Sequence, residues 1–254
     1  MPQQVTTPKI RSHYLGVDAN LSSSLVLFIK REKRLPEYER LLSSPKPMGA
    51  VFTGLTGKYQ GHSVLVLATG VGPGQIGDAV LAVNLCDSIA LYSGTCGGLS
   101  EELAIGDFVC PTWAVCGDGF SMFHGCNPFE TVASDPTVAL GVRNWLRSSH
   151  LPCKAGTTFT TCTVVSEAEP NFWDHVTAQC LAIEMGAAAF FAACQTTGMR
   201  GAAMFWVTDL PLHGASFFDA LTTEQTEVKE NRYGIMPRLE LDTLVSLAPL
   251  RTEL

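Results

Sequence analysis

Short apolar runs alternate along the chain with longer stretches of mixed polarity. Several of the runs are apolar throughout, which is typical of strands that are covered on both faces. Strands are predicted at His13–Val17, Val64–Thr69, Ile89–Ser93, Asp107–Val115, Thr157–Val165, Cys180–Glu184 and Ala202–Thr208. Apolar residues at helical spacing predict helices at Gln75–Cys86, Pro136–Ser149, Ala187–Thr196 and Thr223–Leu247, with a helix-like segment at Ser22–Leu42 that breaks near Pro36.

This alternation of strands and helices predicts an α/β fold with three layers, α/β/α, around a central sheet. No repeat, low-complexity tract or long linker divides the chain, so residues 1–254 are expected to form a single domain. The Gly- and aromatic-rich segment Gly117–Ser134 is the best candidate for a flap.

Composition and charge exclude several classes of protein. With 46% hydrophobic residues, the chain has enough apolar surface to fold rather than remain disordered. Its net charge of −7 argues against nucleic-acid and anionic-membrane partners. One basic cluster, Lys30, Arg31, Lys33 and Arg34, is expected to be an exposed helix end.

The nine cysteines show no Cys-x-x-Cys pair and no spacing typical of a zinc site, and most have apolar neighbours. We therefore expect reduced thiols, a cytoplasmic location, and neither a metal nor another cofactor. The most hydrophobic region, Leu181–Val207, is interrupted by Glu184 and Arg200, which argues against a membrane span.

Glycine-rich turns and carboxylates follow the predicted strands. Thr69–Gly74 and Ser93–Gly98 let backbone N–H groups approach a ligand, although tight turns need glycine for steric reasons alone. Glu184 and Asp209 each end an apolar strand, at the sheet edge where open α/β sheets bind ligands. Burial would raise the pKa of either acid and suit it to general acid catalysis; the alternative is that either one caps a helix.

The ordered set of these motifs resembles the nucleoside phosphorylase-I family, which includes hexameric purine nucleoside phosphorylases, uridine phosphorylases and methylthioadenosine nucleosidases. The resemblance covers nearly the whole chain from Tyr14 onward. Its landmarks are Gly54–Gly61, Thr69–Gly72, Gly94–Gly98, Ile105–Thr112, Glu184-Met185, Val207–Asp209 and Glu224–Thr226.

The resemblance implies a twisted, mixed and partly barrel-like sheet, and a homo-oligomer between a dimer and a hexamer with active sites at a dimer interface. It implies cleavage of a nucleoside N-glycosidic bond, with Asp209 as the acid beside the purine. Met185 would pack under the sugar with Glu184 beside it, and Thr95 would lie on the phosphate or nucleophile loop together with Gly97.

Other positions depart from the family pattern. Tyr92, Ala50 and the loop Gly16–Leu21 stand where phosphate-binding arginines are expected, and Asp18 in that loop would repel phosphate. Phosphate dependence is therefore doubtful, and Asp18 is the one candidate for activating water instead. Gly186 replaces the second glutamate of Glu-Met-Glu, which holds the ribose hydroxyls, and Asn231 stands for the arginine that assists the acid.

Three hypotheses remain open. The first is a glycosyltransferase (phosphorylase) or N-glycosyl hydrolase acting on a purine-type nucleoside. The second is a repurposed enzyme that performs isomerisation, cyclisation or elimination on a non-nucleoside small molecule, with Asp209 as acid. The third is a non-catalytic binding or storage protein. The ligand cavity would be lined by Phe159, Met185, Phe205, Trp206 and Phe217, unless the aromatic residues belong to the core.

Overall fold

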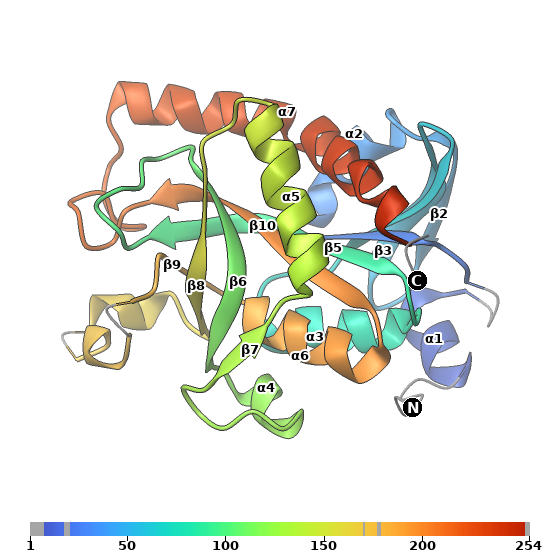
Figure 1. Cartoon of the computed structure of the whole chain (residues 1–254), viewed down its shortest axis with the longest axis horizontal. Helices are drawn as coiled ribbons and strands as arrows, with labels where there is room; N and C mark the ends of the chain where they lie inside the picture. The colour runs from blue at the N-terminus through green and yellow to red at the C-terminus, as the bar shows by residue number, and fades with distance from the viewer. Residues whose placement is uncertain (1–7, 18–20, 170, 177–178, 252–254) are drawn as a thin grey trace.

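The computed structural model describes residues 8–17, 21–169, 171–176 and 179–251. Its strands run in the order β10-β6-β8-β9-β5-β1-β4-β3-β2, and β7 pairs with β6 (Figure 1). The strands are β1 (Leu25–Ile29), β2 (Ser43–Gly49), β3 (Thr53–Tyr59), β4 (His62–Ala68), β5 (Ile89–Gly98), β6 (Phe108–Gly117), β7 (Thr131–Ala133), β8 (Cys153–Thr161), β9 (Ala182–Glu184) and β10 (Arg200–Asp209).

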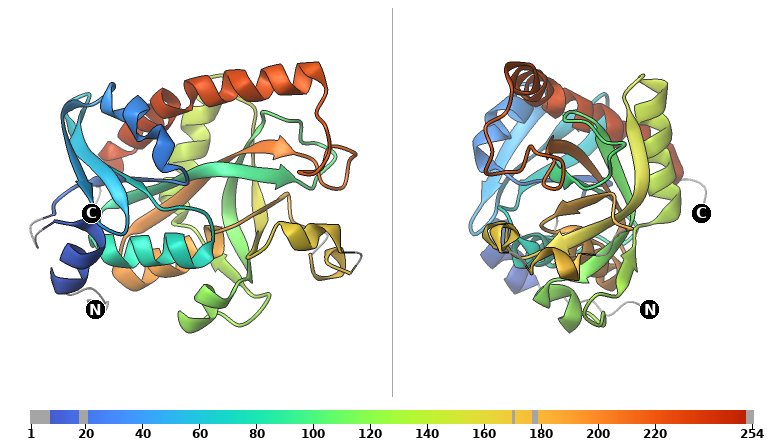
Figure 2. Two further views of the ribbon diagram at one scale, coloured as in Figure 1. Left: turned by 180° about the vertical axis from the view of Figure 1, so that it is seen from behind. Right: turned by 90° about the vertical axis from the view of Figure 1, so that its left-hand side faces the viewer.

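Part of this sheet closes on itself. β10 pairs with both β6 and β5, so β5, β9, β8, β6 and β10 form a five-stranded barrel. The barrel is mixed, because β10 is parallel to β5 but antiparallel to β6. The right-hand view of Figure 2 looks toward the barrel from the side where β5 and β10 end. The predicted mixed, partly barrel-like sheet is confirmed.

Helices cover the sheet on both sides, which confirms the three layers. α3 (Pro73–Val83) and α6 (Ala187–Thr197) pack together on one face, with α1 (Pro8–Leu15) and α4 (Gly119–Phe123) beside α3. α5 (Pro136–Ser148), α7 (Thr223–Ser246) and α2 (Leu35–Glu39) lie on the other face (Figure 1). Short 3-10 turns are η1 (Glu32–Arg34), η2 (Val165–Ala168), η3 (Trp173–His175) and η4 (Ala248–Arg251).

The first strand differs from the prediction. The chain enters the sheet at β1, which lies parallel between β4 and β5 and sends alternate side chains into the cores on its two faces. The prediction of a strand at His13–Val17 was wrong, because Pro8–Leu15 forms α1 and packs against α3. The helix-like interpretation of Ser22–Leu42 was also wrong over β1, since five consecutive buried apolar residues fit a doubly covered strand.

Two further findings concern predictions from the sequence. The segment proposed as a flap, Gly117–Ser134, contains α4 and β7, and Asp118 caps α4 by accepting a hydrogen bond from the Ser121 amide at 2.8 Å. Within the described part of the chain, no helix is long and apolar enough to cross a bilayer.

Candidate functional site

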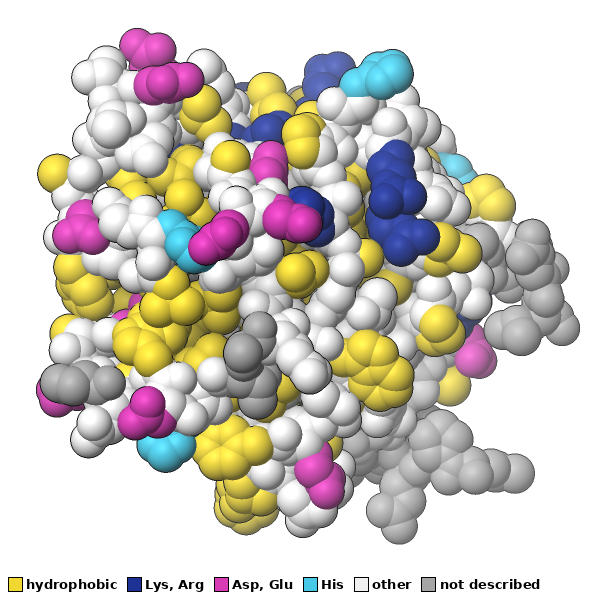
Figure 3. Space-filling view, turned by 60° about the vertical axis from the view of Figure 1, so that its left-hand side comes forward, with side chains coloured by type: hydrophobic (Ala, Val, Ile, Leu, Met, Phe, Trp, Pro, Cys, Tyr) yellow, Lys and Arg dark blue, Asp and Glu magenta, His cyan; other side chains and the backbone are white. Residues whose placement is uncertain are grey.

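A cavity of about 230 Å³ opens at the carboxyl ends of β1, β5 and β10, where the ligand edge of the sheet is expected. Hydrophobic side chains gather on the side of the molecule toward which β5 and β10 run, interspersed with acidic ones (Figure 3). The lining residues are Lys30, Arg31, Val71, Thr95, Cys96, Gly97, Thr161, Val164, Glu167, Ile183, Glu184, Met185, Thr208, Asp209 and Phe217.

Asp209 is the last residue of β10 and only 7% exposed. Burial raises the pKa of its carboxyl group, while a hydrogen bond from the Thr208 hydroxyl to Oδ1 (2.8 Å) and the charges of Lys229 and Lys30 act in the opposite direction. Gly97 provides the space for this carboxyl group, since a Cβ there would lie 2.9 Å from Asp209 Oδ2. The structure thus places Gly97 and Asp209 together.

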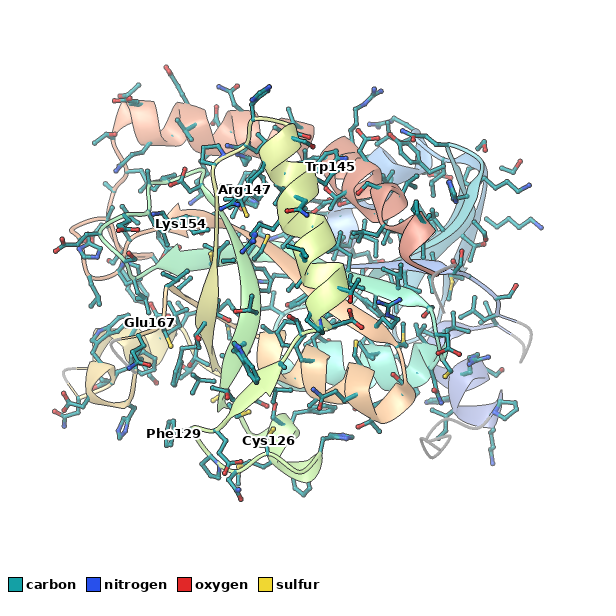
Figure 4. All side chains as sticks on the ribbon, viewed as in Figure 1. Cys126, Phe129, Trp145, Arg147, Lys154 and Glu167 are labelled. Carbon is teal, nitrogen blue, oxygen red and sulfur yellow. The ribbon has the colours of Figure 1, made fainter. Side chains whose placement is uncertain are left out.

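Glu167 supplies a second carboxyl group to the cavity, from η2 in the segment between β8 and β9 (Figure 4). Burial, followed by the negative charge of Asp209, raises the pKa of Glu167 to about 7. Two neighbouring carboxyl groups that repel each other favour a state in which one of them keeps its proton. Glu167 was not predicted from the sequence, because it lies in a polar loop and ends no strand.

Glu184 also lines the cavity, but its carboxylate is engaged by the protein. It accepts a hydrogen bond from the Thr160 hydroxyl and bonds from the Ala187 amide at 2.8 and 3.0 Å, so it caps the start of α6. Burial raises the pKa of Glu184 to about 7 against the opposing effects of the Lys30 charge and these hydrogen bonds. The helix-cap alternative therefore describes a role that Glu184 does fill.

The position of Lys30 differs most clearly from the prediction for the basic cluster. Lys30 follows β1 and is half-buried, and its ammonium group donates a hydrogen bond to the Thr95 carbonyl oxygen at 2.8 Å. Burial lowers its pKa, and the charge of Glu184 opposes that change. The expectation of an exposed helix end was wrong for Lys30 because β1, and not a helix, precedes it. Arg31 is exposed and also lines the cavity.

The position of Lys30 bears on the phosphate-binding arginines that the family pattern expects and this chain lacks. The loop after the first central strand begins at Lys30, so it is not Gly16–Leu21, and it brings Lys30 and Arg31 to the cavity beside Thr95. Asp18 lies outside the described residues. Arg232 stacks on the Phe108 ring at 4.7 Å, and the α7 side chain whose charge lowers the pKa of Asp209 is Lys229.

The remaining predicted residues divide between the cavity and the core. Met185 lines the cavity, as does Phe217, which is 63% exposed. Phe205 is fully buried against Tyr92 and is absent from the lining, while Phe159 packs in a small apolar cluster with Ile183. Phe159 and Phe205 thus occupy core positions next to cavity-lining residues.

Space beside Gly186 is already filled. A Cβ at this position would lie 2.8 Å from Ile76 Cγ2 and 3.0 Å from the Tyr92 hydroxyl oxygen. That hydroxyl group is buried and has no hydrogen-bond partner among the described residues. Tyr92 and Ile76 therefore take the room that a longer side chain at residue 186 would need.

Comparison with known proteins agrees with this architecture. A family model described as the phosphorylase superfamily matches residues 24–235. The chain belongs to this superfamily. A curated superfamily relative, a DeoD-type purine nucleoside phosphorylase from Clostridium beijerinckii, is 24% identical over 202 residues, which cover 76% of this chain and 80% of the relative.

Solved structures show the same superfamily fold. Uridine phosphorylase from Vibrio fischeri in complex with 6-hydroxy-1-naphthoic acid is 17% identical, with a TM-score of 0.76 over 90% of this chain and 94% of the other. Purine nucleoside phosphorylase from Toxoplasma gondii in complex with immucillin-H is 18% identical, with a TM-score of 0.73 over 91% and 93% of the two chains.

Proposed function

We propose that this chain cleaves the N-glycosidic bond of a purine-type nucleoside, with Asp209 as the acid that protonates the departing base. The observation that carries the proposal is the pairing of Asp209 and Glu167 as two titratable carboxyl groups in one cavity. Membership of the phosphorylase superfamily and the name of the Clostridium relative support this class of reaction.

Asp209 and Glu167 could act on the two products of bond cleavage, the departing base and the sugar. As the bond to the base breaks, the base nitrogen takes a proton from Asp209, and positive charge develops on the sugar. A carboxylate at Glu167 stabilises that charge and can accept a proton from an attacking water molecule. Because the pKa of Glu167 is about 7, this group changes its protonation state close to neutral pH.

Because Lys30 and Arg31 line the cavity, phosphate is a candidate nucleophile that must be tested against water. They supply the only basic side chains among the lining residues that the structure describes, and both lie in the wall that contains Thr95. A cationic pair can hold an anion near the sugar, whereas the three acids Glu167, Glu184 and Asp209 disfavour a dianion. Hydrolysis and phosphorolysis therefore make opposite predictions about added phosphate.

The test is release of free base from a panel of purine nucleosides, followed by chromatography with and without inorganic phosphate. Release in either condition that is lost in Asp209→Asn supports the proposal, and its dependence on phosphate identifies the nucleophile. Full activity of Asp209→Asn, or no release by well-folded wild-type protein, would overturn it.

One observation favours a second candidate, acid–base chemistry on a non-nucleoside molecule. The family resemblance implies a ribose-binding glutamate at position 186. This chain has glycine there, and Tyr92 and Ile76 fill the space that a glutamate side chain would need. Asp209 and Glu167 would still exchange protons with a ligand that carries no ribose. Inactivity toward every nucleoside, combined with Asp209-dependent turnover of another compound, would establish this candidate instead.

A further inference from the structure

A second, larger hollow lies on another part of the molecule and shares no lining residue with the cavity around Asp209. This groove, of about 460 Å³, lies between α5 and the strands β6, β7 and β8. Its lining residues are Cys110, Thr112, Trp113, Ala133, Ser134, Pro136, Ala139, Leu140, Arg143 and Ala155. We refer to it as the α5 groove.

A bulge in β6 creates the strand side of the α5 groove. The pairing of β6 with β8 shifts between Pro111 and Trp113, so Thr112 is an extra residue in the strand. Adjacent strand residues normally point to opposite faces, yet Thr112 and Trp113 both line the groove. Pro111, the residue before the bulge, has no N–H group to donate to the ladder.

One stripe of α5 forms the opposite wall. Pro136, Ala139, Leu140 and Arg143 are spaced i, i+3, i+4 and i+7, so they share one helix face. The small side chains of Ala139 on α5 and Ala133 on β7 do not fill the groove. Leu140 and Trp113, each 49% exposed, keep large apolar surfaces in contact with solvent.

Arg143 is the one charged residue of this lining within the described chain. Its Nε atom is buried without a hydrogen-bond partner, and no described acid forms an ion pair with its guanidinium group. A buried, unpaired donor on a charged group costs free energy, so an anion that reaches it would be stabilised. The hydroxyl groups of Thr112 and Ser134 already donate to the carbonyl oxygens of Gly156 and Thr112.

Two thiols lie near the charged end of the groove. Cys110 Sγ and Cys153 Sγ are 3.3 Å apart. A hydrogen bond with Cys110 lowers the pKa of the Cys153 thiol, as do the charges of Arg147 and Arg143, while burial and the charge of Asp107 act in the opposite direction. Arg147 is exposed one turn beyond Arg143 (Figure 4). Two arginines, Arg143 and Arg147, thus lie at this end, whereas most of the other groove-lining residues are apolar.

We propose that the α5 groove binds a small monocarboxylate with an apolar body, whose carboxylate pairs with Arg143 and whose hydrocarbon part lies between Trp113 and Leu140. The volume lies within the range of small-molecule sites. The guanidinium group of Arg143 complements a single negative charge, and the hydroxyl groups of Thr112 and Ser134 are already engaged with backbone carbonyl oxygens. The site is independent of the reaction at Asp209.

Calorimetric titration of the full chain tests this site with three probes. Decanoate and 2-naphthoate distinguish an aliphatic from an aromatic acid, and decanol carries the apolar body without charge. We expect at least one acid to bind saturably to the wild type, and Arg143→Met to weaken that binding by roughly tenfold or more without changing the weak binding of decanol. A change in intrinsic tryptophan fluorescence should follow the decanoate titration in the wild type and be reduced in Trp113→Phe, since the other three tryptophans lie outside the groove.

Matched variants locate the ligand. Arg147→Met, which changes an exposed arginine one turn away, should change the affinity less than threefold, as estimated for a screened surface charge. Ala139→Leu should fill the groove and remove binding of every probe, and Arg143→Lys should restore part of the acid affinity in a folded protein. The thermal transition of each variant checks that it is folded.

Three results would overturn the proposal. One is the absence of binding by both acids to folded wild-type protein. Another is loss of binding in Lys30→Met but not in Arg143→Met, which would place the acid in the other cavity. The last is a change of sedimentation coefficient in Leu140→Asp together with no acid binding, which would show that a second copy of this chain covers the groove.

Discussion

Replacing Glu167 by Gln tests the electrostatics of the candidate site without any assumption about the substrate. The change removes the charge but keeps the shape of the side chain. Because burial and Asp209 raise the pKa of Glu167 from 4.5 to about 7, ionisation of this group costs the folded state free energy that the unfolded state does not lose.

The sign and size of the effect follow from that difference in pKa. The cost is absent below pH 4.5, develops as the pH rises toward 7, and is complete above pH 7. The full difference corresponds to about 3 kcal/mol, and solvent screening of this half-buried group reduces it to about 2 kcal/mol. Glu167→Gln should therefore match the wild type at pH 4.5 and be more stable by about 2 kcal/mol at pH 8.

The assay is denaturant unfolding of both proteins at pH 4.5, 6 and 8. Glu184 titrates in the same range, but it is present in both proteins, so their difference isolates Glu167. Glu169→Gln, an exposed glutamate two residues away, is the matched control and should leave stability within about 0.5 kcal/mol at every pH. An equal stability of Glu167→Gln and the wild type at pH 8 would refute the reasoning. If Glu167 also accepts a proton in the reaction, the more stable variant should be less active.

Four further substitutions give separate outcomes. Asp209→Asn should lower turnover about 10²–10⁴-fold while its circular dichroism spectrum stays that of the wild type. Gly97→Ala should displace the Asp209 carboxyl group, because the new Cβ would lie 2.9 Å from Oδ2, and lower turnover at least about tenfold at a stability cost of about 1–3 kcal/mol. Tyr92→Phe removes a buried hydroxyl group without a partner and should raise the free energy of unfolding by about 1 kcal/mol; a loss of stability would show that the hydroxyl is satisfied. Gly186→Glu should destabilise the protein by about 3 kcal/mol or more in thermal and denaturant unfolding, because it forces a charged side chain against Ile76 and Tyr92.

The sequence predicted those parts of the fold in which burial leaves a simple pattern. β4, β5, β6 and β10 are apolar over most of their length because both faces are covered, and α5 shows a clear amphipathic repeat. β1 was missed because five apolar residues are followed at once by a run of charges, which resembles an exposed helix. β2 is mostly exposed and contains two prolines, so no alternation marks it as a strand.

The charged residues of the candidate site were predictable where they end a strand, as Asp209 and Glu184 do, and their place at the carboxyl edge follows from the sheet. The resemblance to the family also indicated Thr95, Gly97 and Met185, which line the cavity. Lys30 was missed because its position depends on the parallel register of β1 between β4 and β5, which is a non-local property. Glu167 and Arg143 were missed for the same kind of reason, since a single charged residue in a loop or on a helix carries no periodic signal.

Closure of the barrel has a consequence for the order in which the protein can fold during synthesis. β5 ends at Gly98, yet its partner β10 is not complete until Asp209, more than a hundred residues later. Until β10 has been made, the edge of β5 that pairs with β10 is open, and the side of α6 that packs on β10 is uncovered in the nascent chain. Pairing over such a separation is slow, so this interval is the period in which chaperones and aggregation compete for the chain. A truncated product that ends in α6 should accumulate as insoluble protein, because the strand that closes the barrel is the last one added.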